Sequence, residues 1–174
     1  AIAVGHPYGV SGARLTGHLL LSTLHTNDAT TTLPRLIDMG VEPYLIASTV
    51  NIAIGQRLVR KICRHCQIQK SLSGSQRQSL QNLLSAPPPD RDLPVYQGQG
   101  CAACGNSGFA GRIGLHEILV LDAGLRESVL QKASAAKLRD LAIRRGFEPM
   151  AIDGWRKVSA GLTTVDELLR TQYE

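Results

Sequence analysis

The sequence predicts an α/β protein that carries a small metal-binding module and a helical C-terminal region. Three observations lead to this fold class. A short apolar run at residues 18–24 ends in polar residues, which is typical of a buried parallel strand. Two Cys-x-x-Cys pairs follow at residues 63–66 and 101–104. Amphipathic helical patterns then fill the chain from residue 122 onward.

The composition is that of an ordinary globular protein. Of the 174 residues, 43% are hydrophobic and 19% charged, so the chain can form one core, or a core with a small appendage. The net charge of +5 and the pI near 9.3 are compatible with nucleic acid, anionic lipid or nucleotide partners. Aromatic residues make up only 4%, and no contiguous basic stripe occurs, which argues against nucleic-acid binding.

The spacing of the four cysteines predicts a single metal site. Cys63 and Cys66 form one pair, and Cys101 and Cys104 form the other, so that each pair places two thiolates on a tight turn. Four sulfur ligands favour zinc or an iron–sulfur centre over hard cations, but the sequence offers no redox partner for a cluster. Disulfides are the alternative. We find no secretory signal and no apolar run long enough to span a bilayer, so a reducing compartment is expected.

Helix and strand signals alternate in the first third of the chain. Asp28 can cap a helix that ends at Gly40. Pro43 opens a second helix, whose apolar face continues to Ile54. A short strand over residues 56–62 then leads into the first cysteine pair.

The segment between the cysteine pairs is polar and contains a short predicted helix at residues 75–84 followed by a proline-rich linker. Residues 112–121 read as a strand that pairs with the strand at 56–62 near the metal. The rest is predicted to be helical, with helix starts at Asp122, Ser134, Pro149 and a capping box of Thr164 and Glu167. Trp155 is the expected centre of the surface that packs these helices.

A series of motifs runs from about Leu15 to the end of the chain. Residues 16–28 read Thr-Gly-His-Leu-Leu-Leu-Ser-Thr-Leu-His-Thr-Asn-Asp, and further motifs follow in order: Leu36–Pro43, Gln56–Arg60, both cysteine pairs, Gly111–Glu117 and Gly161–Thr164. This order of motifs resembles the C-terminal half of the hexameric ATPases that drive type II secretion and type IV pilus assembly, and residues 16–28 match the histidine box of that family.

The resemblance implies a truncated RecA-like P-loop ATPase core, a zinc-bearing tetracysteine module and a helical C-terminal tail. It implies that His18 and His25 sense or polarise the nucleotide phosphates, with Thr23 and Asn27 beside them. In the family, a hexameric ring hydrolyses ATP with Mg²⁺ and powers protein export or pilus extension. The ring lies on the cytoplasmic side of the inner membrane and contacts inner-membrane platform proteins, and no nucleic acid is expected as a partner.

The sequence departs from the family at the phosphate-binding parts. It contains no G-x-x-x-x-G-K-[ST] motif and lacks the acidic segment expected before the histidine box. Those parts position the phosphates and the magnesium ion during phosphoryl transfer. We therefore expect no ATP hydrolysis by this chain alone.

The first residues resemble a different family. Residues 1–18 are similar to the GHP motif of thiolases, in which the histidine that matches His6 activates a nucleophilic cysteine. Because all four cysteines stand in paired turns, thiolase activity is not expected. The chain is thus predicted to be a chimera. It would consist of a thiolase-like N-terminal segment at 1–17, a remnant of a RecA-like core at 18–62, the tetracysteine module with its linker at 63–111, and a strand with helices at 112–174.

Two other functions stay open on the residues alone. A zinc-dependent module that binds nucleic acid or protein would use the cysteines and the basic charge. A coenzyme A enzyme would instead require His6 as a catalytic residue.

Overall fold

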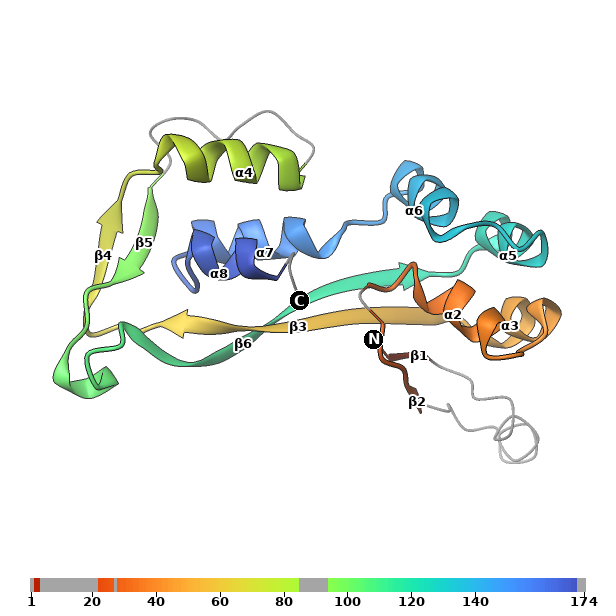
Figure 1. Cartoon of the computed structure of the whole chain (residues 1–174), viewed down its shortest axis with the longest axis horizontal. Coiled ribbons are helices and arrows are strands. Elements are labelled where there is room, and N and C mark those ends of the chain that lie inside the picture. The colour runs from red at the N-terminus through yellow and green to blue at the C-terminus, as the bar shows by residue number, and fades with distance from the viewer. Residues whose placement is uncertain (1, 4–21, 27, 85–93, 172–174) are drawn as a thin grey trace. The chain divides into compact units, whose positions relative to one another are not determined.

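The structure is a computed structural model that describes residues 2–3, 22–26, 28–84 and 94–171 (Figure 1). Helices and strands both contribute to the described part, in agreement with the predicted α/β class. The finer expectation of a RecA-like core stays a prediction.

Two sheets organise the described residues. The larger sheet has the strand order β2-β1-β3-β6, formed by β2 (Ser22–Thr23), β1 (Ile2–Ala3), β3 (Ile52–Ile62) and β6 (Phe109–Val120). Strand β1 pairs antiparallel with both β2 and β3. The smaller sheet is an antiparallel pair of β4 (Gln67–Lys70) and β5 (Val95–Gly98).

The long strands β3 and β6 confirm the predicted pairing of residues 56–62 with 112–121, since they are neighbours in the sheet. Strand β3 begins earlier than predicted, at Ile52, where the sequence indicated the end of a helix. Val50 has left the helical region with ψ at 120°, and β-branched residues with alternating exposure follow it. Their apolar side chains fit both a helical and a strand pattern, which explains why the sequence placed the start of the strand too late.

The strand predicted at residues 18–24 is only partly described, because residues 18–21 lie outside the described part of the chain. Its described part, Ser22–Thr23, pairs antiparallel with β1, and the side chain of Thr23 is exposed. The expectation of a parallel strand is therefore wrong for these two residues, and the expectation of burial is wrong for Thr23.

The described residues form several short helices, most of them beginning where the sequence predicted. They are α2 (Thr32–Asp38), α3 (Pro43–Thr49), α4 (Gly74–Leu84), α5 (Ala123–Leu130), α6 (Ala135–Arg144), α7 (Met150–Ser159) and α8 (Val165–Arg170). Asp122 caps α5 by accepting from Leu125 N at 2.9 Å, and Ser134 caps α6. The predicted capping box at α8 is only half formed. Thr164 Oγ1 accepts from the N–H of Glu167, but the Glu167 carboxylate binds Arg60 instead.

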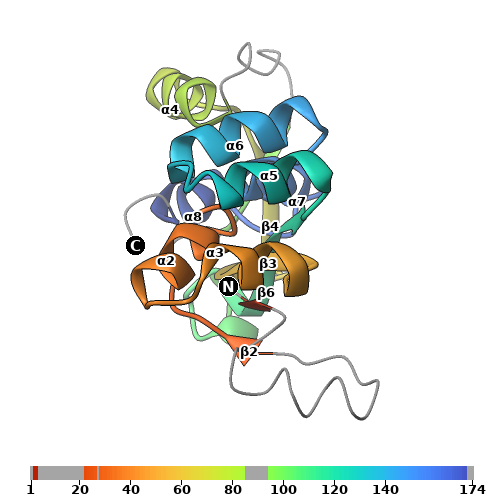
Figure 2. The same cartoon turned by 90° about the vertical axis from the view of Figure 1, so that its right-hand side faces the viewer.

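The chain forms two compact units, and each is built from two separated segments. The first unit comprises residues 1–56 and 116–149, and the second comprises residues 57–115 and 150–174. Within the first unit, α3 packs against α5 and α5 against α6 (Figure 2). Its apolar core draws on these helices and on the inward faces of β3 and β6: Ala29, Leu33, Leu36, Ile46, Ala47, Val50, Ala53, Leu119, Leu121, Leu125, Val129, Leu138, Ala142 and Phe147.

The second unit has a separate and smaller apolar core. It joins α4, α7 and α8 to the strands, through Val59, Leu72, Leu80, Val95, Leu115, Val158, Val165 and Leu168. Trp155 is partly buried against this core, at its margin rather than at its centre. Gly154 allows α7 and α8 to approach closely, because a Cβ atom there would lie 2.3 Å from Leu168 Cδ1.

Candidate functional site

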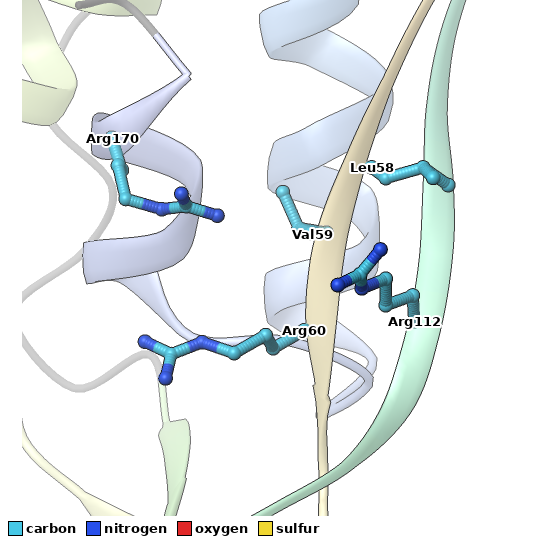
Figure 3. Close-up of a pocket in the computed structure, with 5 residues that line it drawn as sticks. All are labelled: Leu58, Val59, Arg60, Arg112 and Arg170. Carbon is cyan, nitrogen blue, oxygen red and sulfur yellow. The ribbon is translucent and has the colours of Figure 1, made fainter. Parts of the chain in front are cut away.

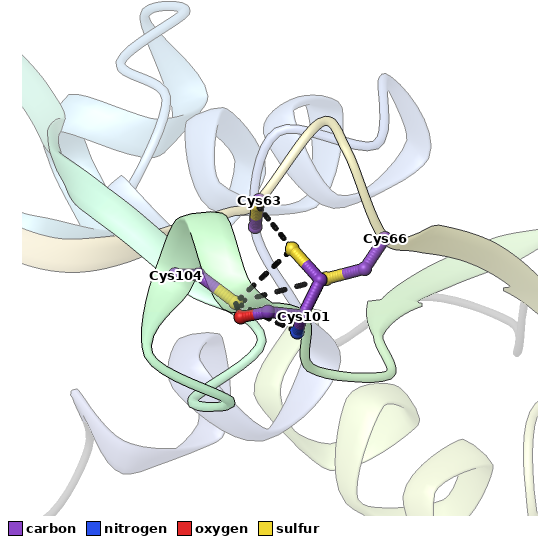
Figure 4. A group of neighbouring side chains, drawn as sticks. All are labelled: Cys63, Cys66, Cys101 and Cys104. Atoms are coloured by element: carbon purple, nitrogen blue, oxygen red, sulfur yellow. Dashed lines mark hydrogen bonds between the residues drawn. The ribbon is translucent and has the colours of Figure 1, made fainter.

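The four cysteines converge in the second unit, although 34 residues separate the two pairs in sequence (Figure 4). Cys63 and Cys66 lie on the turn between β3 and β4. Cys101 precedes the short 3₁₀ turn η1 (Ala102–Cys104), and Cys104 is its last residue. All four sulfur atoms lie within 4.8 Å of one another. The Cys63–Cys101 and Cys66–Cys104 sulfur pairs are 3.9 Å apart, and the Cys101–Cys104 pair is 3.7 Å apart.

These separations fit a tetrahedral metal site. Four sulfurs at the usual zinc–sulfur distance of about 2.3 Å stand about 3.8 Å from each other along the edges of a regular tetrahedron. A disulfide would require about 2.05 Å, and all four cysteines are free thiols. The donor set is therefore suited to zinc and not to a disulfide pair.

Backbone N–H groups point at the sulfurs and favour their thiolate forms. The N–H of Cys101 donates to Cys104 Sγ at 3.2 Å, and this bond is the main reason that the pKa of Cys104 falls to about 6. Gly108 N donates to the same sulfur at 3.3 Å. Burial raises the pKa of Cys66 to about 11, even though its sulfur accepts from Gly100 N at 3.3 Å. A bound cation would offset that burial cost directly.

Close backbone contacts hold the two cysteine turns together. Cys63 N donates to Gly108 O at 2.9 Å, and Gln99 N donates to Cys66 O at 3.0 Å. A Cβ atom on Gly98 would lie 2.0 Å from Gly108 O, so this crossing of two backbones requires glycine at residue 98. These backbone contacts help to bring the two cysteine turns together.

The predicted histidine box is only partly within the described residues. His18 and Asn27 lie outside them. Thr23 and His25 are both exposed, at the end of β2 and just after it. The structure therefore leaves the proposed nucleotide contacts of these four residues as predictions.

The turn that follows His25 is held by Asp28, which the sequence predicted as a helix cap, and by Glu117, which the sequence analysis did not assign. The Asp28 carboxylate accepts from Thr31 N at 2.7 Å and from the Thr30 hydroxyl at 2.8 Å. Glu117, which is only 3% exposed, accepts from Ala29 N at 2.6 Å. The burial of Glu117 could have been predicted from the sequence, because Glu117 lies on the same face of the predicted strand as the buried leucines of β6.

Among the described residues, no helix combines the length and the apolar character that crossing a membrane requires.

Comparisons with known proteins place these features in a family. Residues 10–170 match the family model of the type II/IV secretion system proteins. This match starts inside the segment predicted to be thiolase-like, so residues 10–17 are part of it. For residues 1–9 the resemblance to thiolases stays a prediction.

Curated relatives agree with the family match. The chain is 41% identical over 158 residues to the type IV pilus assembly ATPase TfpB of Acinetobacter baylyi, which covers 91% of this chain and 26% of the relative. It is 39% identical over 158 residues to the type II secretion system protein HxcR of Pseudomonas aeruginosa, covering 91% of this chain and 29% of the relative. For the type IV pilus assembly ATPase PilB of Thermus thermophilus, the identity is 37% over 162 residues, covering 93% of this chain and 18% of the relative.

The chain thus spans between about a fifth and a third of the length of these relatives. Both the family model and the relatives cover nearly all of the chain, including both cysteine pairs. By this match the chain belongs to the family of type II/IV secretion system proteins.

Proposed function

We propose that this chain supplies the C-terminal part of an ATPase that works as a hexameric ring and powers type II secretion or type IV pilus assembly. The observation that carries the proposal is the family match over residues 10–170. The names of the relatives, type IV pilus assembly ATPases and a type II secretion system protein, support it. Because the relatives are several times longer, ATP hydrolysis and the full RecA-like core are properties of the longer protein.

In this proposal the tetracysteine cluster is a structural zinc site. Cys63, Cys66, Cys101 and Cys104 would hold the ion. The three sulfur–sulfur separations of 3.7 or 3.9 Å, with all four sulfurs within 4.8 Å of one another, support a closed tetrahedral set. Bound zinc would supply a cross-link between two turns distant in sequence. With four protein ligands, the site keeps no open position for a substrate.

The histidine box would act at the nucleotide. His18 and His25 would respond to the charge on the terminal phosphate, with Thr23 and Asn27 beside it, while ATP and Mg²⁺ bind mainly to parts of the longer protein. The bond from Ala29 N to Glu117 supports this role indirectly, because it fixes the backbone directly after the box. We propose that the assembled protein works on the cytoplasmic face of the inner membrane, against platform proteins of the secretion or pilus machine.

A grafting experiment tests the proposal. Residues 22–171 of this chain replace the corresponding segment of TfpB, and ATP turnover and pilus formation are measured in the hybrid protein. We expect measurable ATP turnover in the hybrid. The His25→Ala variant of the hybrid should turn over ATP at least about tenfold more slowly, because it lacks the imidazole that is proposed to act at the terminal phosphate. The isolated chain, which has no phosphate-binding loop motif, should show no turnover above the blank.

The controls make the outcome decisive. His65→Ala, in the cysteine turn, is the matched control, and it should leave hybrid turnover within about twofold. A hybrid that assembles normally and binds ATP but never hydrolyses it would contradict the proposed role of this segment.

A further inference from the structure

The second compact unit offers two places at which a small molecule can act, a cavity and the sulfur cluster. The cavity has a volume of about 540 Å³, and its arginine side chains do not point at a common centre (Figure 3). None of the described residues that line it is a cysteine. Thiolates are strong nucleophiles among protein side chains, so the sulfur cluster is the reactive part of this unit.

The four sulfurs are equal in charge once they hold the zinc ion of the proposed function, on which this step depends. Zinc binds cysteine as the thiolate, so each sulfur of the loaded site is deprotonated. Their reactivity then differs for two other reasons. A backbone N–H that donates to a metal-bound sulfur withdraws electron density from it, and burial keeps reagents away from it.

Backbone N–H groups donate to two of the four sulfurs. Cys104 Sγ accepts from Cys101 N at 3.2 Å and from Gly108 N at 3.3 Å. Cys66 Sγ accepts from Gly100 N at 3.3 Å. Among the hydrogen bonds of the described residues, none joins a backbone N–H to either of the other two sulfurs. Those two sulfurs therefore keep more electron density when the metal is bound.

Burial separates these other two sulfurs, which belong to Cys63 and Cys101. Cys63 is 1% exposed, whereas Cys101 is half-buried. Ala102 and Ala103, which follow Cys101 on η1, are exposed and carry only methyl groups, so neither shields it with a large side chain. Cys101 is therefore the accessible sulfur that accepts no backbone N–H from the described residues.

We propose that Cys101 is the site at which peroxides modify this chain. Its thiolate attacks one oxygen of hydrogen peroxide, which forms a sulfenic acid and releases hydroxide. The thiolate of Cys104, whose sulfur lies 3.7 Å from Cys101 Sγ, then attacks that sulfur (Figure 4). A disulfide forms and a second hydroxide leaves, so the two sulfurs lose two electrons in total and the peroxide takes up both.

Cys104 is the resolving cysteine because it lies on the same short turn as Cys101. A disulfide requires the two sulfurs to approach from 3.7 Å to about 2.05 Å, which is a change local to this turn. Cys63 has its sulfur 3.9 Å from Cys101 Sγ, but it lies on the other turn, where its N–H donates to Gly108 O at 2.9 Å. The new disulfide leaves Cys63 and Cys66 as ligands, too few for a closed zinc site, so the ion is released.

A site with four equally protected sulfurs would react with no preferred order. Here two N–H bonds protect Cys104, one protects Cys66, and burial protects Cys63. The proposal therefore predicts which sulfur reacts first and not only that the cluster reacts.

The test treats the purified, zinc-loaded chain with a limiting amount of hydrogen peroxide. Dimedone in the reaction traps sulfenic acid, and tandem mass spectrometry locates the adduct. We expect the dimedone adduct on Cys101 and, without dimedone, a disulfide between Cys101 and Cys104. Zinc released into solution, measured with a chromogenic chelator, should rise in step with that disulfide.

Two variants with the same ligand set separate Cys101 from a neighbouring sulfur of similar exposure. Cys101→His and Cys66→His each keep four ligands, since three cysteines and one histidine also form closed zinc sites. Cys101→His removes the thiolate that we propose reacts first, so peroxide should release its zinc about tenfold more slowly than that of Cys66→His. His65→Ala, on the exposed part of the other turn, is the control and should release zinc within about twofold of the wild-type rate.

The outcomes that overturn the proposal are distinct from those that overturn the zinc site. A first adduct on another cysteine, no reaction of the zinc-loaded chain, or equal zinc release from Cys101→His and Cys66→His would each overturn it. If either variant fails to bind zinc, the position of the first adduct in the wild type decides. A purified chain that binds no zinc at all would instead contradict the metal site of the proposed function.

Discussion

Different interactions stabilise the interiors of the two compact units of this chain. The apolar core of the first unit contains 14 buried hydrophobic residues among those that the structure describes, whereas the core of the second contains 8. The second unit adds what the first lacks among its described residues, a cluster of four thiols. It also buries a glutamate that binds two arginines.

This contrast has consequences for stability. Burial of apolar surface depends little on metal, so the first unit should resist chelators. The second unit has a smaller core, and small cores often need a metal or another cross-link to be stable. The second unit should therefore respond to metal removal, while the first does not.

Metal removal should give the largest difference between the units. Chelation of the metal that we propose at the four thiols should destabilise the second unit by about 5 kcal/mol or more, because binding and folding of such a module are linked. Hydrogen exchange measured by mass spectrometry should show faster exchange in residues 63–111, with little change in residues 28–50. Cys63→Ser should have the same effect without a chelator.

The metal content itself provides the control for this experiment. The untreated chain should carry about one zinc per molecule by elemental analysis, in line with its single set of four thiols. Unchanged exchange in residues 63–111 after complete metal removal would show that the second unit does not depend on the ion.

Glu167 should give the next largest effect. Burial alone would raise the pKa of its carboxyl, but the hydrogen bonds from the Arg60 side chain and backbone lower it more, so the net pKa is below the ordinary value. Glu167→Gln should cost about 2 kcal/mol at neutral pH, the range expected for a lost bond to a charged group. The cost can be measured by urea unfolding, followed through Trp155, which lies in this unit.

The pH dependence of that cost follows from the lowered pKa. The stabilisation is fully present above the ordinary glutamate pKa of about 4.3, and it is lost as the pH falls through the lower pKa of the folded state. The wild type and Glu167→Gln should therefore converge below about pH 4. Asp166→Asn is the matched control, since Asp166 is exposed, and it should change stability by less than about 0.5 kcal/mol. A constant difference between wild type and Glu167→Gln down to pH 2 would contradict this account.

The sequence predicted features that depend on nearby residues better than those that depend on distant ones. The cysteine pairs were assigned as one cluster because each pair is a local turn with characteristic spacing. The starts of α5 and α6 were found through their capping residues Asp122 and Ser134. In each case a few consecutive residues determine the local structure.

The features that sequence analysis missed depend on contacts between distant segments. Arg60 and Glu167 are 107 residues apart, and nothing local to either indicates that they meet. The half-formed capping box has the same cause, since Arg60 draws the Glu167 carboxylate away from the helix start. The early start of β3 was missed because Ile52 and Ile54 suit both a helix face and a strand.

Packing at Gly154 should give a smaller effect, again confined to the second unit. A methyl group there would lie 2.3 Å from Leu168 Cδ1 and 3.2 Å from Leu115 Cδ1, both on fully buried side chains. Gly154→Ala should destabilise the unit by about 1–2 kcal/mol, because the overpacking outweighs the gain in helix propensity of about 1 kcal/mol. Gly74→Ala on α4 is the control, since its Cβ would meet no atom within 4 Å. Equal stability of Gly154→Ala and Gly74→Ala in urea unfolding would show that α7 and α8 can separate without cost.

The helix cap at Ser134 should give the smallest effect, and it should appear in the first unit. The Ser134 hydroxyl accepts from Lys137 N at 3.4 Å and so satisfies one N–H at the start of α6. Ser134→Ala should cost about 0.5–1 kcal/mol and speed hydrogen exchange in α6, with no change in residues 63–111. Ser134→Thr keeps the hydroxyl and should retain most of the stability. If Ser134→Thr lost as much as Ser134→Ala, the cap would not be the cause, and α6 would be held only by its apolar contacts through Leu138 and Ala142.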